Sequence, residues 1–278
     1  MPVWNGGKYI REAIDGILAQ SFADFELVVV DDGSTDDTIS IVESYSDERI
    51  KVVKQGKRGF VCAVNRGVEE SSAEWIARHD ADDVSHPMRL EIQWAALLKN
   101  PKAVLCFCNV DVFGINAPTQ ATRWFPKSHS LIALRSCHQC PVVVGAALIK
   151  RSMFFAAGGY REEEFPAEDY AFASRLLRLG RFVGCPEILY SVRVHESQIS
   201  QVKRQAQIEK TKLVALQNCR DFFRISEDRV QEVYGTLCQD RECQSLSHCL
   251  RLLFYLLTFR CQSVELWIWA ANRLRRAL

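Results

Sequence analysis

Three aspartates crowd into the stretch "WIARHDADDVSHP", where Asp80, Asp82 and Asp83 follow directly on an apolar run. Carboxylates this close together repel one another, so a chain tolerates them best around a cation. A D-x-D pair offers the oxygen ligands that Mg²⁺ or Mn²⁺ prefers, usually together with substrate phosphates. The pattern therefore predicts a divalent metal site at Asp80 and Asp82, with a simple turn cap as the alternative.

The acidic residues come at the ends of two predicted strands. Asp31 and Asp32 follow the β-branched run "ELVVV", which is typical of a strand buried on both faces, and the three aspartates above follow "EWIARHD". Helical spacing surrounds these strands, for example in "KYIREAIDGILAQ" and "MRLEIQWAALLKN". Ser34 and Thr35 are candidate caps for a helix in "DDTISIVESYS". Strands alternating with helices predict an α/β fold with a Rossmann-like, mostly parallel sheet flanked by helices, whose strand carboxyl ends bind ligands.

The chain divides into two parts by pattern and by charge. Its 278 residues, 48% of them hydrophobic, suit one large domain with an appendage, and we expect an α/β domain over residues 1–202. Only helices are predicted over residues 203–278, which carry 13 Lys/Arg against 8 Asp/Glu. The whole chain has a net charge of +1, which gives no general attraction to nucleic acid.

The last residues mix aromatic side chains with arginines, in "LSHCLRLLFYLLTFRCQSVELWIWAANRLRRAL". This pattern favours amphipathic helices that lie on an anionic membrane surface. A helical cap on the α/β domain and a dimer contact are the alternatives.

The chain has 11 cysteines, an odd number without a recognisable signal peptide, which favours a reducing cytosol. The motif "CHQC", from Cys137 to Cys140, has the spacing of a redox or zinc site, but no second Cys or His pair stands at a suitable distance. We therefore expect most cysteines to be small core residues. No run reaches the roughly 18 apolar residues of a membrane span, so the expected location is cytoplasmic, with peripheral contact at the inner face of the membrane.

Five motifs along residues 1–200 share their wording with one known family. They are "MPVWN", "LAQSFADFELVVVDDGSTDDT", "NRGVEESSAEWIARHDADDVSHPMRLEIQ", "GGYREEEFPAEDYAFASRLLRLG" and "YSVRVHESQIS". In that order they resemble the inverting glycosyltransferases of family 2, which have the GT-A fold and include bacterial surface-glycan glycosyltransferases. The resemblance implies an enzyme, a hexosyl- or N-acetylhexosaminyl-transferase, that uses a nucleotide-diphosphate sugar.

The resemblance also implies which residues bind the donor. In the family, the P-V-x-N segment and the aspartates after the second strand hold the nucleotide base. Trp4 would stack on the base, which we expect to be uracil, and Asp32 would hydrogen-bond to it. The structural alternatives are a core position for Trp4, a helix cap for Asp32 and a solvated charge for Arg66. The expected nucleotide-sugar residues are Pro2, Val3, Trp4, Asn5, Asp31, Asp32, Asn65, Arg66, Asp80 and Ala81.

A divalent cation, Mn²⁺ or Mg²⁺, is implied as the cofactor that bridges the diphosphate of the donor. The expected ligands are Asp82, Asp80 and His195, and Asp83 would orient them from behind. A lone histidine is more often structural than a ligand, so the assignment of His195 rests on the resemblance.

The catalytic base falls in the E-D motif, Glu168-Asp169, according to the same resemblance. We expect Asp169 to accept the proton of the acceptor hydroxyl as its oxygen attacks the sugar. A carboxylate at the start of a helix also caps that helix, which is the structural alternative for both residues.

The expected reaction moves a single sugar, from a UDP-sugar, to a hydroxyl of a glycan or lipid-linked acceptor with inversion, in the synthesis of cell-surface polysaccharide or lipid-linked glycan. The Q-x-x-R-W motif of processive synthases is absent, which favours single transfers. A non-catalytic nucleotide-sugar-binding protein is the alternative. A nicotinamide-dependent enzyme is disfavoured because no G-x-G-x-x-G follows a strand. The sequence identifies neither the sugar nor the acceptor.

The start of the chain departs from the family pattern. A full strand normally precedes P-V-x-N, whereas Pro2 is the second residue here. We expect most of this strand to be missing from the sheet and its two neighbours to be exposed. We also expect residues upstream of Met1 to be needed for a stable enzyme; the alternative is a domain that tolerates the loss of this strand.

Overall fold

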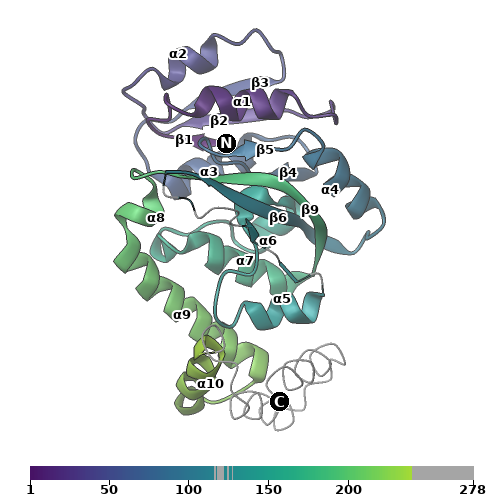
Figure 1. Ribbon diagram of the computed structural model, residues 1–278, viewed down its shortest axis with the longest axis vertical. Helices are drawn as coiled ribbons and strands as arrows, with labels where there is room; N and C mark the ends of the chain where they lie inside the picture. The colour runs from purple at the N-terminus through teal and green to yellow at the C-terminus, as the bar shows by residue number, and fades with distance from the viewer. Residues whose placement is uncertain (116, 118–121, 124, 127, 240–278) are drawn as a thin grey trace.

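The computed structural model describes residues 1–239 except 116, 118–121, 124 and 127. The described chain forms two β-sheets with helices packed around them, followed by a helical C-terminal part (Figure 1). The predicted α/β class with a parallel sheet is confirmed.

The first sheet is parallel and has three strands, in the order β1 (Pro2–Val3), β2 (Leu27–Asp31) and β3 (Ile50–Lys54). All five residues of β2 are buried, as its β-branched run predicts. The helices that follow these strands are α1 (Ile10–Leu18), α2 (Thr38–Glu43) and α3 (Phe60–Glu70). The helix α2 begins after Asp37, so the prediction that Ser34 and Thr35 cap it was wrong.

The second sheet is mixed and has six strands. The order is β4 (Trp75–Ala77), β8 (Leu148–Lys150), β6 (Ala103–Gly114), β9 (Arg181–Val194) and β5 (Val84–Ser85), with β7 (Thr122–Arg123) on β6. Only β6 and β9 run parallel. The prediction that "EWIARHD" joins the parallel sheet was therefore wrong, because β4 pairs antiparallel with β8. Hydrophobic patterning marks a strand but does not encode the direction of its partner.

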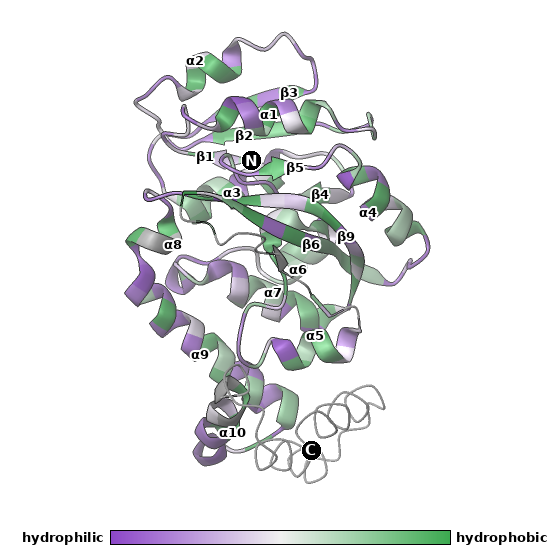
Figure 2. Ribbon diagram, in the orientation of Figure 1, coloured by the Kyte–Doolittle hydropathy of each residue, from purple (hydrophilic) through white to green (hydrophobic). Residues whose placement is uncertain are grey.

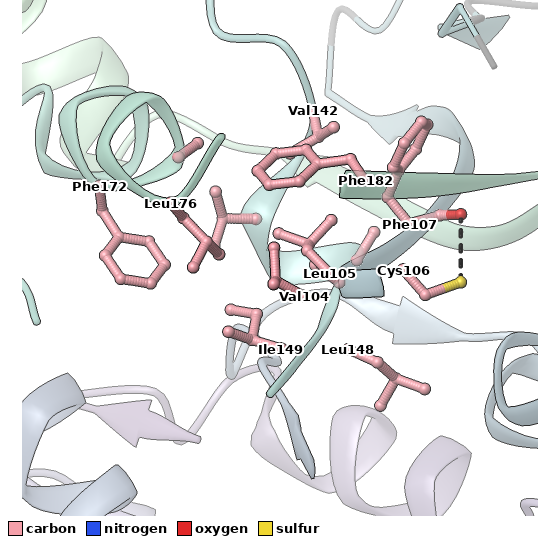
Figure 3. Close-up of a cluster of buried hydrophobic side chains, with 14 of the residues drawn as sticks. Val104, Leu105, Cys106, Phe107, Val142, Leu148, Ile149, Phe172, Leu176 and Phe182 are labelled. Atoms are coloured by element: carbon pink, nitrogen blue, oxygen red, sulfur yellow. Dashed lines mark hydrogen bonds between the residues drawn. The ribbon is translucent and has the colours of Figure 1, made fainter. Parts of the chain in front are cut away.

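The main core lies where β6 and β9 pack against helices (Figure 3). Side chains from β6 (Leu105, Phe107), β8 (Ile149) and helix α7 (Phe172, Leu176) meet there. The first eight residues of β6 are all buried, so this strand has apolar neighbours on both faces. The other elements of this part are α4 (Arg89–Leu98), α5 (His129–Arg135), η1 (Val144–Ala146), α6 (Arg151–Ala156), η2 (Glu162–Glu164) and α7 (Glu168–Leu179).

A charged side chain, Arg89 from the "PMRL" motif, is buried in this core with only 1% of its surface exposed. Its guanidinium donates to the carbonyl oxygens of Arg78 (3.0 Å) and Gly145 (3.1 Å) and to the Ser85 hydroxyl (3.0 Å). These bonds satisfy the buried donors and tie the segment that carries the three aspartates to the rest of the core.

Beyond the second sheet the described chain continues as helices as far as Gln239, in line with the predicted helical C-terminal part. They are α8 (Ile199–Val202), α9 (Arg204–Phe223) and α10 (Glu227–Gln239). Figure 2 shows hydrophilic and hydrophobic stretches alternating along α9. Leu134 of α5 packs in one cluster with Cys219, Phe223 and Val233 of α9 and α10, so this part covers the α/β domain as a helical cap. The arginine-rich segment over which we expect a membrane surface lies outside the described residues.

The cysteines of the described chain follow the prediction for small core residues. Cys106, Cys108, Cys137, Cys185 and Cys219 are buried free thiols. Within "CHQC", the Cys140 thiol donates to the carbonyl oxygen of Val142, and the Cys137 carbonyl accepts from Cys219 Sγ at 3.0 Å. Among the described residues, no helix is both long and apolar enough to span a membrane.

An apolar cavity of about 300 Å³ lies between the two sheets. Leu27 and Val28 of β2 line one side of it, Trp75 and Ile76 of β4 line the other, and Met1 lies at its end. Figure 1 accordingly places the N-terminus in the interior, between the strands of the two sheets. Burial lowers the pKa of the Met1 amine to about 5.

We expect a five-residue apolar, β-branched extension before Met1 to raise the melting temperature by about 5 °C. Such a segment would continue β1 along β2, fill the cavity and replace the buried amine by an amide. Differential scanning calorimetry measures the effect, with a Gly-Ser extension of equal length as the control. Equal melting temperatures for the two extensions would contradict the prediction.

Candidate functional site

The three aspartates lie on the loop between β4 and β5, and residues of β9 hold this loop. Asp83 is buried, and its Oδ1 accepts the backbone N–H of Arg193 at 2.8 Å. The Arg193 guanidinium donates to the carbonyl oxygen of Asp82 at 2.8 Å, and the Tyr190 hydroxyl accepts the N–H of Asp80 at 3.1 Å. Asp83 thus faces inward and supports the loop, which leaves Asp80 and Asp82 at its outer side.

Asp82 meets His195 across 113 residues of sequence. The distance between Asp82 Oδ2 and His195 Nε2 is 2.9 Å, and His195 Nδ1 lies 2.9 Å from the Ser197 hydroxyl. The His195 ring also packs on Tyr9, with 4.7 Å between the ring centroids. The structure therefore brings together two of the three predicted metal ligands, one after β4 and one after β9.

Asp80, the third predicted ligand, pairs with a buried guanidinium. The Arg78 Nη1 donates to Asp80 Oδ2, and Arg78 is only 7% exposed. Burial raises the pKa of Asp80 to about 6, and the Asp82 and Asp169 charges add to the rise while Arg78 opposes it. The Arg78 charge also interacts with Asp169 and so links the two acidic groups of the site.

At the end of β2, both aspartates accept backbone N–H groups. Asp31 Oδ1 accepts the N–H of Ser34 at 3.1 Å. Asp32 Oδ1 accepts from Gln55 Nε2 (2.7 Å) and from the N–H groups of Arg58 (2.7 Å) and Gly59 (3.0 Å), and its Oδ2 accepts from Gly59 at 2.9 Å. Asp32 thus anchors the start of α3. The alternative predicted for Asp32 was a helix cap, and α3 is a more distant helix than expected.

The "PVWN" segment lies beside this strand end. Trp4 is 50% exposed with the Lys57 ammonium 4.1 Å from its ring centroid, so the alternative of a core position is excluded. Asn5 has a left-handed backbone (φ 50°), and its Oδ1 accepts the N–H of Thr35 at 2.8 Å. Pro2 and Val3 pair with β2, and Ala81 packs against the cluster that contains Val3.

Two predicted nucleotide residues of α3 have partners within the protein. Asn65 hydrogen-bonds in both directions to the backbone of Tyr160, at 2.9 Å each. Arg66 is half-exposed and pairs with Glu70 at 2.5 Å and with Glu69 at 3.8 Å. Arg66 therefore occupies the solvated position that was its structural alternative, although both residues border a pocket that also contains Arg58.

The acidic pair opens α7, but its two carboxyl groups differ. Glu168 is 7% exposed, and burial, with the neighbouring Asp169 charge, raises its pKa to about 8. Asp169 is half-buried, and its Oδ1 accepts a hydrogen bond from the Tyr160 hydroxyl. At neutral pH Glu168 is therefore mostly protonated. Asp169 is the more exposed of the two carboxyl groups.

The raised pKa makes folding stability depend on pH. Glu168 binds its proton more tightly in the folded chain, so the free energy of unfolding falls as pH rises from about 4.5 towards 8. We expect Glu168→Gln to reduce this loss by on the order of a few kcal/mol. Melting temperatures from pH 5 to 9 test it, with exposed Glu48→Gln as the control. Equal pH slopes for wild type and Glu168→Gln would count against the raised pKa.

No role was predicted from the sequence for three residues of the site. Arg78 lies two positions before the D-x-D, Tyr160 follows the paired glycines, and Tyr190 lies near the end of β9. A lone arginine inside an apolar strand run is a signal that could have identified Arg78, because such a charge is buried only with a partner. The tyrosines carry no comparable signal.

The arrangement can bind a charged leaving group and accept a proton at separate places. Asp82 and His195 offer ligand atoms beside the strand ends of β4 and β9, and Asp169 offers a carboxylate from α7. Among the described residues, no three His, Cys, Asp or Glu side chains are grouped tightly enough to form a complete metal site by themselves.

Comparisons with known proteins identify the family of this arrangement. Residues 1–156 match the family described as "Glycosyl transferase family 2". An uncharacterised glycosyltransferase of Haemophilus influenzae is 30% identical over 233 residues, which are 77% of this chain and 70% of that protein. One of Rickettsia typhi is 30% identical over 71% of this chain but only 64% of its own length.

Solved structures share the fold at low sequence identity. S. aureus TarS 1–349 in complex with UDP-GlcNAc has a TM-score of 0.66 and 19% identity, covering 99% of this chain and 79% of TarS 1–349. The mannosyltransferase PcManGT of Pyrobaculum calidifontis, in complex with GDP-Man and Mn²⁺, has a TM-score of 0.55 and 18% identity, covering 99% of this chain and 84% of PcManGT. With the family match over residues 1–156, the chain belongs to family 2 of the glycosyltransferases and has the GT-A fold.

Proposed function

We propose that this chain transfers a single sugar from a UDP-sugar to an acceptor hydroxyl, with inversion and with the help of a divalent cation. One observation carries the proposal: the pair Asp82–His195 and the carboxylate of Asp169 stand on separate elements of one site, linked through Arg78 and Asp80. An inverting transfer needs such a division between groups for the leaving diphosphate and a base for the acceptor.

The edge at β2 supports the binding of a nucleotide base. Asp32 Oδ2 accepts one N–H group, so it retains acceptor capacity for an N–H of the base. The exposed ring of Trp4 offers a stacking surface close to it. The TarS complex with UDP-GlcNAc, which has the same fold, supports a UDP-sugar as the donor.

Asp82 and His195 suit Mn²⁺ or Mg²⁺. Their ligand atoms are 2.9 Å apart, and Asp82 keeps 28% of its side chain exposed, so an ion can reach both. Such ions usually take one or two carboxylates from the protein and complete their shell with substrate phosphates and water. A bound ion would offset the negative charge of the leaving nucleoside diphosphate. Asp80, with its raised pKa and its bond to Arg78, suits a supporting position beside them.

Asp169 is the base in this proposal. As the acceptor oxygen attacks C1 of the sugar, its proton passes to Asp169, and the bond between C1 and the diphosphate oxygen breaks. Glu168 is the weaker candidate. It is mostly protonated at neutral pH, and a protonated carboxyl group cannot take up the proton of the acceptor. The hydrogen bond from Tyr160 holds Asp169 in place.

The acceptor that we propose is a glycan or a lipid-linked glycan, handled in the cytoplasm at the inner face of the membrane. The excess of Lys and Arg over Asp and Glu in residues 203–278 supports contact with an anionic surface. The buried free thiols of the described chain suit a reducing compartment.

A panel of nucleotide sugars tests the donor class. We expect UDP-sugars with Mn²⁺ to raise the melting temperature, because a bound ligand stabilises the folded state. Release of UDP from the protecting donor, with water as the acceptor, then tests turnover. Protection by GDP-sugars alone would overturn the UDP assignment, and binding without any turnover would favour a non-catalytic nucleotide-sugar-binding protein.

A further inference from the structure

Asn65 and Tyr160, which are 95 residues apart in the sequence, are joined by a pair of hydrogen bonds. The Asn65 Nδ2 donates to the carbonyl oxygen of Tyr160, and the N–H of Tyr160 donates to Asn65 Oδ1, both at 2.9 Å. The carboxamide of Asn65 therefore uses one N–H donor and its oxygen acceptor in hydrogen bonds to a single residue, Tyr160. Two bonds in opposite directions fix both the distance and the rotation of the Tyr160 backbone.

The backbone before Tyr160 is shaped to allow this contact. Gly159 has a left-handed conformation (φ 59°), and a Cβ at this position would lie 2.9 Å from Asn65 Oδ1. Any other residue would strain the backbone and press on the carboxamide. Gly159 thus gives the carboxamide room to approach.

The ring of Tyr160 is held as firmly as its backbone. Tyr160 is 3% exposed and packs between Phe154 and Phe172, with ring centroids 6.1 Å and 5.1 Å away. Its hydroxyl emerges from this apolar shell and donates to Asp169 Oδ1. The direction of this O–H bond is therefore set by the core and by Asn65, not by solvent.

The helix α3 connects this unit to the nucleotide side of the site. Asn65 lies on α3, whose Val61, Val64 and Val68 pack into the main core, and the start of the helix is anchored on Asp32. A rigid helix thus runs from the predicted base-binding aspartate to the loop that holds the predicted general base.

We propose that Asn65 and Tyr160 are positioning residues for Asp169: Asn65 holds Tyr160, and the Tyr160 hydroxyl occupies Asp169 Oδ1 so that Oδ2 faces the acceptor. This inference rests on the proposed role of Asp169 as the base. It assigns Asn65 to the acceptor side of the reaction, whereas the family resemblance implies a role in binding the donor. A base held by one oxygen keeps a single orientation of the other, which a near-attack geometry requires.

Tyr160→Phe tests the unit because it keeps the ring and removes only the hydroxyl. We expect kcat for hydrolysis of the UDP-sugar that the panel identifies, with Mn²⁺ present, to fall roughly tenfold while KM for the donor stays unchanged. Loss of a donor to a carboxylate disfavours its charged form, so the acidic limb of the pH–rate profile should move to higher pH.

Tyr170→Phe is the matched control. Tyr170 lies on the same helix as Asp169, is equally buried (3% exposed), and donates its hydroxyl to the carbonyl oxygen of Ser136. This variant should lose a buried hydrogen bond without changing kcat or the pH profile. If both phenylalanine variants lower kcat alike, the effect is structural and the inference is wrong.

Asn65 is tested by a graded pair of variants. Asn65→Asp keeps an acceptor for the Tyr160 N–H but loses the donor to its carbonyl, and Asn65→Ala loses both. We expect kcat to fall further in the alanine variant than in the aspartate variant, with an unchanged KM for the donor. A raised donor KM at unchanged kcat would instead return Asn65 to the nucleotide side.

A double variant separates this inference from the function on which it rests. If Tyr160 acts through Asp169, Tyr160→Phe should cause no further loss of turnover in an Asp169→Asn background. Normal turnover in Asp169→Asn itself would refute the proposed base. A large loss in Asp169→Asn together with full activity in Tyr160→Phe would refute only the positioning unit.

Discussion

Asp169→Asn is expected to lower turnover at least about 100-fold, the usual scale for a lost general base, and to leave the affinity for the donor nucleotide nearly unchanged. Asparagine keeps the size of the side chain and an oxygen that can accept the Tyr160 hydroxyl, but it cannot take up the proton of the acceptor. Rates of UDP release measure the first effect, and calorimetric titration with UDP and Mn²⁺ measures the second.

The chain contains its own control for the helix-cap alternative. Glu227 and Asp228 open α10 as Glu168 and Asp169 open α7, and Asp228 is exposed. Asp228→Asn removes a first-turn carboxylate of the same kind and should leave turnover unchanged. If Asp169→Asn and Asp228→Asn behave alike, the E-D motif of α7 is only a helix cap. If Glu168→Gln loses turnover while Asp169→Asn keeps it, the base is Glu168.

Asp82→Ala should abolish the Mn²⁺-dependent part of UDP binding, with an affinity loss of more than about 100-fold. The physical reason is that Asp82 supplies the accessible carboxylate of the Asp82–His195 pair, while Asp83 is buried and Asp80 pairs with Arg78. The fold should persist, because Asp82 holds the loop through its carbonyl oxygen, which the variant keeps. Calorimetric titration with UDP, with and without Mn²⁺, measures the change.

His195→Ala is expected to weaken the same binding by a smaller factor, since neutral imidazole adds less to a hard ion than a carboxylate does. Asp24→Ala is the control, because Asp24 is an exposed carboxylate before the other end of β2. Mn²⁺-dependent binding that survives unchanged in Asp82→Ala would remove this residue from the metal site. Equal losses in Asp24→Ala would show a general charge effect.

The local pattern of residue types determined much of the catalytic part of this protein. The β-branched run of β2 and the helical spacing of α1 predicted those elements, because their periodicity reflects which faces are buried. The same reasoning placed Asp31 and Asp32 at a strand end, where the structure has them. The start of α7 at Glu168 also follows from the sequence, since acidic residues favour the first turn of a helix.

Only the tertiary structure decided which partners these residues take. The sequence does not show that Asn65 hydrogen-bonds to the backbone of Tyr160 or that Asp32 anchors the start of α3. The strand β4 was assigned to the parallel sheet, yet it pairs antiparallel with β8. Each of these contacts joins segments that are 26 to 95 residues apart, and hydrophobic periodicity carries no information on such pairings.

Burial separated the two carboxyl groups of the E-D motif, which are chemically almost equal in the sequence. Glu168 turns into the core, where desolvation raises its pKa to about 8, while Asp169 stays half-buried beside the Tyr160 hydroxyl. The family resemblance implied a base within this pair, at Asp169. The buried surroundings that raise the pKa of Glu168 exist only after α7 has packed against the core, because desolvation depends on neighbours from the whole chain.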